Sequence, residues 1–105
     1  MKLLTKAIKA KLPPLFSQDG KDPTQVPIVV KFFTPDANCT WYITEGEPTE
    51  EDDWVLFGWC SLGFGPGFDE LGTVMLSDLE SIRGPLGLKV ERDIHFKGML
   101  AEVMN

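Results

Sequence analysis

Lysine and arginine are absent from the middle of this 105-residue chain, between positions 32 and 80. That segment carries eleven Asp and Glu residues, whereas residues 1–31 have a net charge of +4 and residues 81–105 a net charge of +1, so the whole chain carries −6. Binding to nucleic acid needs a basic surface. We therefore expect no binding to duplex nucleic acid and instead expect a protein partner with a basic surface.

Cysteine and long apolar runs are also scarce. The two cysteines, Cys39 and Cys60, are too few for a disulfide scaffold and match no zinc-binding spacing, so we expect free thiols, no metal and no cofactor. No apolar run is long enough to cross a membrane. Lysines at positions 6, 9 and 11 interrupt the first apolar segment, which argues against a secretion signal and favours a cytoplasmic protein.

The composition is that of an ordinary globular protein, with 43% hydrophobic and 25% charged residues, and the length suits a single domain over residues 1–105. The residue pattern predicts a helix at 6–12 capped by Thr5, strands at 28–34, 39–45, 54–62 and 72–76, a helix at 78–83 with a capping box at Ser77, and an extended segment at 88–96. These elements predict an α+β fold with a mostly antiparallel sheet of four to five strands.

Aromatic side chains and carboxylates are concentrated in the same acidic middle. Residues 45–53 hold six carboxylates, whose spacing does not match an EF-hand loop and is typical of a solvated hairpin tip. Core packing accounts for most of the aromatic residues, and a surplus on the second face of the sheet would form a partner surface. The candidate interaction surface combines the two groups: Trp41, Tyr42, Trp54, Trp59, Glu50, Glu51, Asp52 and Asp53.

The glycine-rich stretch GFGPGFDELG at 63–72 resembles a phosphate-binding loop only superficially. It lacks the Lys-Ser/Thr pair of a P-loop, does not match GxGxxG, and contains Asp69 and Glu70, which would repel a phosphate. We interpret its glycines as turn residues.

One constellation near the C-terminus has the residue types of a catalytic site. On a strand, Glu91, Asp93 and His95 would project to one side, about 7 Å apart. They could then bind a metal ion or perform acid–base catalysis. The alternative interpretation is a solvent-exposed strand face.

Arg92 would lie on the opposite face of that strand, beside apolar residues. Because an unpaired buried charge is costly, we expect Arg92 to be structural, paired with a carboxylate or placed at a helix end. The carboxylates considered are Asp36, Asp69 and Glu70.

Six short motifs give the chain a family resemblance. They are KFFTPD at 31–36, TWY at 40–42, ELG at 70–72, LSDLE at 76–80, RGPLGL at 83–88 and ERDIHF at 91–96. In this order, and over residues 3–97, the chain resembles the small bacterial proteins grouped as domain of unknown function 2958. The resemblance implies an accessory gene of a plasmid, conjugative element or phage. The family has no established activity, so the resemblance supplies no catalytic residue.

These observations predict a non-enzymatic accessory protein that binds a protein partner through an acidic, aromatic-rich surface, with an anti-defence or regulatory effect. The alternative is a small metal-dependent or acid–base enzyme that uses Glu91, Asp93 and His95. Convergence of those three side chains in a pocket would favour the enzyme. The sequence leaves the oligomeric state open.

Overall fold

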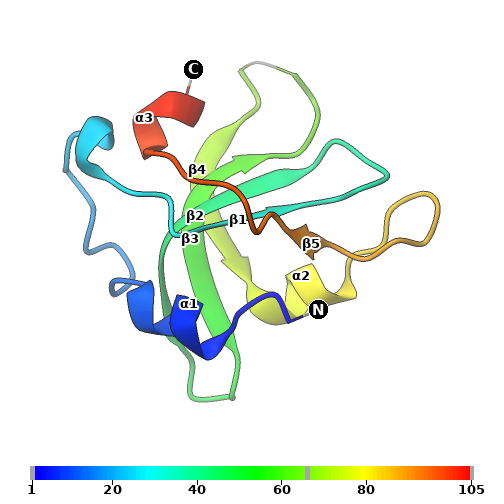
Figure 1. The fold of residues 1–105 in the computed structure, drawn as a ribbon, viewed down its shortest axis with the longest axis horizontal. Helices are drawn as coiled ribbons and strands as arrows, with labels where there is room; N and C mark the ends of the chain where they lie inside the picture. Colours follow the sequence, from blue (N-terminus) through cyan, green and yellow to red (C-terminus); the bar gives the residue numbers. More distant parts are fainter. Residues whose placement is uncertain (1, 66, 105) are drawn as a thin grey trace.

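A computed structural model describes residues 2–65 and 67–104 of the chain. Five strands form one antiparallel sheet in the order β4-β3-β2-β1-β5 (Figure 1). The strands are β1 (Val30–Phe33), β2 (Thr40–Pro48), β3 (Trp54–Ser61), β4 (Glu70–Met75) and β5 (Glu91–Arg92). The helices are α1 (Lys6–Lys11), the 3₁₀ turn η1 (Pro23–Gln25), α2 (Leu76–Ser81) and α3 (Leu100–Val103). The α+β class predicted from the sequence is confirmed.

The register of the sheet separates its side chains into two faces. Val30 pairs with Ile43, and Phe32 pairs with Trp41, so these four apolar side chains share the first face. The second face carries the intervening residues, such as Tyr42. Pairing between β2 and β3 shifts by one residue at Thr44, which forms a β-bulge between Ile43 and Glu45.

The first face is covered by α1 and α2. The Thr5 hydroxyl accepts a hydrogen bond from the Ile8 amide at 3.2 Å and caps α1, as expected, and Pro13 follows directly after the C-cap residue. Leu12 and Leu79 lie in the same buried cluster as Phe32, which is fully buried. These contacts form the larger core of the protein.

The second face is covered by η1 and α3, which pack against each other beside the sheet. Val26, Trp59 and Leu100 form a smaller buried cluster there. The Leu100 amide donates to the Val26 carbonyl at 2.8 Å, so a hydrogen bond joins the C-terminal segment to the residues that precede β1. The sequence did not predict α3, because this single turn has neither helical periodicity nor a Ser, Thr, Asp or Asn cap.

Two predictions of secondary structure in the C-terminal half of the chain were wrong. Helix α2 spans Leu76–Ser81 rather than 78–83, and Ser77 is its second residue and not its cap. The extended segment at 88–96 contains only the two-residue strand β5, because the chain turns at Ile94 and His95. Among the residues that the structure describes, no helix is long and apolar enough to span a membrane.

Candidate functional site

The loop that joins β3 to β4 displays aromatic side chains to solvent. Phe64 and Phe68 are 72% and 68% exposed, and their rings meet edge to face with centroids 6.3 Å apart. Leu62 and Leu71, which flank this pair in the sequence, are also exposed. Clusters of exposed apolar side chains often mark interaction sites in soluble proteins. We call Leu62, Phe64, Phe68 and Leu71 the loop patch.

Glycines in left-handed backbone conformations shape this loop. Gly63, Gly65 and Gly67 have φ angles of +83°, +100° and +91°, which residues with a β-carbon rarely adopt. The carboxylates of Asp69 and Glu70 follow directly, and Glu70 is exposed. The loop patch therefore borders negative charge. The sequence predicted the turn, but a glycine-rich turn gives no sign of which side chains project outward.

The predicted acidic tip between β2 and β3 lies at the other end of these two strands (Figure 1). Glu50, Glu51 and Asp52 are exposed there. Three of the four carboxylates assigned to the candidate interaction surface therefore face solvent.

Asp53, the fourth carboxylate, forms hydrogen bonds within the protein. Its oxygens accept hydrogen bonds from the Ser77 amide at 3.1 Å, the Ser77 hydroxyl at 2.5 Å and the Trp54 amide at 2.7 Å. The hydroxyl of Ser77, followed by the amide of Trp54, lowers the pKa of Asp53 below its ordinary value. Asp53 thus supplies, from a neighbouring strand end, the cap at the start of α2 that the sequence assigned to Ser77.

The four aromatic residues assigned to that surface are mostly internal. Trp41 and Trp59 are buried in the first and second cores, where they cannot contact a partner. Trp54 is partly buried and lies 5.6 Å from the Lys9 ammonium, and Tyr42 packs against Phe96. These four residues lie on β2 and β3 and are divided between the two faces of the sheet. Helices cover both faces. The most exposed aromatic residues are instead Phe64 and Phe68 of the loop patch, followed by Phe16 at 53%.

Glu45 has a buried carboxyl, whereas its place in the acidic stretch 45–53 predicted a position at the solvated hairpin tip. The bulge at Thr44 places Glu45 opposite Phe57 on the second face, and the side chain is only 2% exposed. Its Oε1 accepts a hydrogen bond from the Thr44 hydroxyl at 3.1 Å, while its Oε2 is buried and has no hydrogen-bond partner within residues 2–65 and 67–104. Burial raises the pKa of Glu45 above its ordinary value. No sequence signal marks this bulge, so the burial of Glu45 could not be predicted.

A pocket of about 90 Å³ opens beside Glu45. Its walls come from the loop before η1, the second face of the sheet and the C-terminal segment, and they include Phe16, Asp19, Phe57, Leu71 and Met104. The Phe16 and Phe57 rings pack edge to face with centroids 5.3 Å apart. The pocket therefore combines an aromatic wall with a buried carboxyl.

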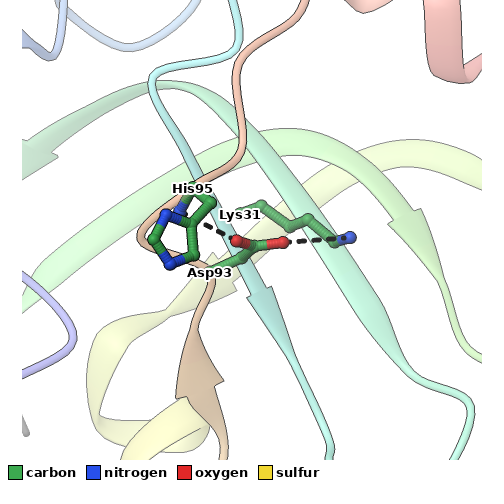
Figure 2. Close-up of polar contacts among 3 residues, drawn as sticks. All are labelled: Lys31, Asp93 and His95. Carbon is green, nitrogen blue, oxygen red and sulfur yellow. Dashed lines mark hydrogen bonds and ion pairs between the residues drawn. The ribbon is translucent and has the colours of Figure 1, made fainter.

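The proposed catalytic constellation does not form. Because β5 ends at Arg92, the strand alternation that would align Glu91, Asp93 and His95 stops after its first member. The Asp93 carboxylate instead lies 3.6 Å from the Lys31 ammonium and accepts a hydrogen bond from the backbone amide of His95 (Figure 2). Within the described part of the chain, no group of three His, Cys, Asp or Glu residues could hold a metal ion.

A larger open cleft of about 740 Å³ lies between α1, the start of β1 and residues 92–99. Asp93 lines this cleft, but Glu91 and His95 are not among its lining residues. The three side chains thus fail the convergence expected of an acid–base site. Lys31 also lies against the rings of Tyr42 and Phe96, which makes the Lys31–Asp93 pair a structural tie between the sheet and the C-terminal segment.

Arg92 contacts backbone carbonyls that were not among the partners expected for it. Its Nη1 donates hydrogen bonds to the backbone carbonyls of Lys2 and Leu3. Two of the predicted partners, Asp69 and Glu70, lie at or beside β4, on the opposite edge of the sheet from β5. Arg92 therefore anchors the N-terminal segment to the β5 edge.

No curated protein and no solved structure matches the chain, whereas a protein-family model does. The family model described as Protein of unknown function (DUF2958) matches residues 3–102, which is nearly the whole chain. The chain therefore belongs to the DUF2958 family.

Proposed function

We propose that this protein works by binding another protein that presents a basic surface, and that the loop patch and its adjoining carboxylates form the contact. The observation that carries the proposal is the exposed Phe64–Phe68 pair, which lies within a 49-residue segment that has eleven acidic residues and no lysine or arginine. Exposed aromatic rings supply contact area, and the surrounding charge selects the partner and accelerates association.

The biological setting belongs to the same proposal. We propose a cytoplasmic accessory protein of a plasmid, conjugative element or phage, which binds a basic surface of a host-defence or DNA-processing enzyme. The sequence resemblance supports the mobile-element setting, and the charge layout supports the basic partner. For the same reason of charge, we expect no gel shift of duplex DNA at physiological salt.

Affinity capture from bacterial lysate tests the proposal when wild type and loop variants are compared. The double variant Phe64→Ser/Phe68→Ser should lose the proteins that wild type captures. Leu86→Ser is the matched control, because Leu86 is 79% exposed in a different loop, between α2 and β5. Capture should also fall as salt rises. Equal capture by wild type and the double variant would contradict the proposal.

The acidic contribution is tested separately. Asp69→Asn/Glu70→Gln should keep the apolar contact and reduce the salt dependence of capture, because fewer charge pairs form across the interface. Glu50→Gln/Glu51→Gln, at the other end of the strands, measures what the hairpin tip adds. An unchanged salt dependence in both variants would show that charge does not select the partner.

A further inference from the structure

The buried Glu45 carboxyl has an unmet hydrogen-bonding requirement. Its Oε2 is buried and has no hydrogen-bond partner among the described residues, and Glu45 is only 2% exposed. Burial raises the pKa of the carboxyl, and the Phe16 backbone opposes this rise without forming a hydrogen bond with Oε2. Buried polar groups in folded proteins nearly always have hydrogen-bond partners, because an unpaired one costs desolvation energy without compensation. Because Glu45 also lines a pocket, a donor that enters this pocket from outside the chain could satisfy the carboxyl.

The chemistry of the pocket selects that donor. The Glu45 and Asp19 carboxyls both line it, so an anion would be repelled. The aromatic rings of Phe16 and Phe57 favour a cation with an apolar stem. At about 90 Å³ the pocket has room for a slim group and not for a nucleobase or a large ring. An alkylammonium group meets all three requirements.

Lys21 of the chain itself also lines the pocket. Its ammonium group instead donates to the side-chain oxygen of Gln18 at 3.2 Å. Glu45 Oε2 is thus left for another cation.

We propose that the Glu45 pocket receives a lysine side chain of the protein partner. The inference rests on the proposed function and specifies how the basic partner is recognised. The ammonium would donate to Oε2 of Glu45, and the methylene stem would pack against Phe57 and Leu71. Leu71 belongs both to the pocket and to the loop patch, so one partner segment can contact the two together.

The binding test uses n-butylammonium chloride as the probe, n-butanol as its neutral counterpart and N-methylguanidinium as the arginine-like alternative. Titrations are followed by the methyl NMR signals of Leu71 and Met104. Butylammonium should shift both signals, butanol should not, and methylguanidinium should bind more weakly. Glu45→Gln should weaken butylammonium binding roughly tenfold or more, as expected for the loss of a charge-assisted hydrogen bond. Glu80→Gln, which changes an exposed acid on α2 outside the pocket, should leave it unchanged.

Three results would overturn the proposal. Equal shifts with butanol and butylammonium would make the pocket merely apolar, and unchanged binding in Glu45→Gln would remove the carboxyl from recognition. Binding that appears only in Lys21→Gln would identify Lys21 as the natural occupant. Lysate capture distinguishes failure of the pocket proposal from failure of the proposed function. Undiminished capture by Glu45→Gln would refute the pocket proposal without affecting the proposed function. Butylammonium binding without any capture that depends on the loop patch would refute the proposed function instead.

Discussion

The carboxylate of Asp36 occupies the space that a β-carbon at position 84 would need. Asp36 lies in the turn after β1, and its Oδ2 accepts hydrogen bonds from the Leu86 amide at 2.7 Å and the Leu88 amide at 3.4 Å. The loop between α2 and β5 therefore closes over this one side chain. Two motifs of the sequence, KFFTPD and RGPLGL, are joined by this contact.

Gly84→Ala should destabilise the fold, because the new methyl group would overlap the Asp36 carboxylate. We expect a loss of about 2 kcal/mol in the free energy of unfolding, typical of overpacking at a closely packed position. Gly72→Ala is the control, since a β-carbon there meets nothing within 4 Å. Chemical denaturation of both variants provides the measurement. Similar losses at the two positions would show that the Asp36–Gly84 contact is not restrictive.

Asp53→Ala should lower the melting temperature by uncapping α2. Hydrogen bonds from Ser77 and Trp54 lower the pKa of Asp53, so its stabilising effect is present above the ordinary value of 3.8 and is lost as the pH falls through the lowered pKa. The difference in melting temperature between wild type and Asp53→Ala should accordingly shrink in acid. Glu51→Ala, at the exposed tip, should leave the melting temperature nearly unchanged. A pH-independent difference would contradict the role given to the carboxylate.

Glu45→Gln should stabilise the protein increasingly as pH rises. Burial raises the pKa of Glu45 above 4.5, with a smaller contribution from Asp19, while the Thr44 hydroxyl and the Phe16 backbone oppose the rise. The folded protein thus holds this proton more tightly than the unfolded chain, which favours folding below pH 4.5, and the advantage is lost as pH rises through the raised pKa.

The melting temperatures of wild type and Glu45→Gln from pH 4 to pH 8 give the test. The variant's advantage should grow over this range, because glutamine does not titrate. Lys21 and Asp19 line the same pocket, so Lys21→Gln and Asp19→Asn are measured alongside. An advantage that is constant or falls with pH would contradict the burial of an ionisable carboxyl at this position.

Arg92→Ala should cost about 2 kcal/mol of stability, because it removes hydrogen bonds from a charged group to the Lys2 and Leu3 carbonyls. His95→Ala should cost little, since His95 is exposed in a turn. Thermal melts of the two variants compare them directly. A larger loss for His95→Ala would reverse the roles assigned to these residues.

Local signals were sufficient to predict much of the fold. The Thr5 cap and Pro13 bound α1, and the β-branched and aromatic runs located β1 to β4 to within two or three residues at most ends. The α+β class followed from their order. These features depend on residues adjacent in the chain, which a single sequence reveals.

The features that the sequence did not predict depend on contacts between distant segments. The cap of α2 comes from Asp53, directly before β3, and Arg92 donates to backbone carbonyls at the opposite end of the chain. The bulge at Thr44, which buries Glu45, also has no local signature. The exposure of Phe64 and Phe68 likewise depends on how the sheet is covered, and not on their own neighbours in sequence.

Hydrogen exchange of the purified complex, compared with the free protein, tests the central claim most directly. If the partner binds at the loop patch, amides of the β3–β4 loop and of the start of β4, residues 62–72, should exchange more slowly in the complex. Amides at 84–89, in the loop closed by Asp36, should be unaffected. Protection confined to residues 84–99, with no change at 62–72, would contradict the account.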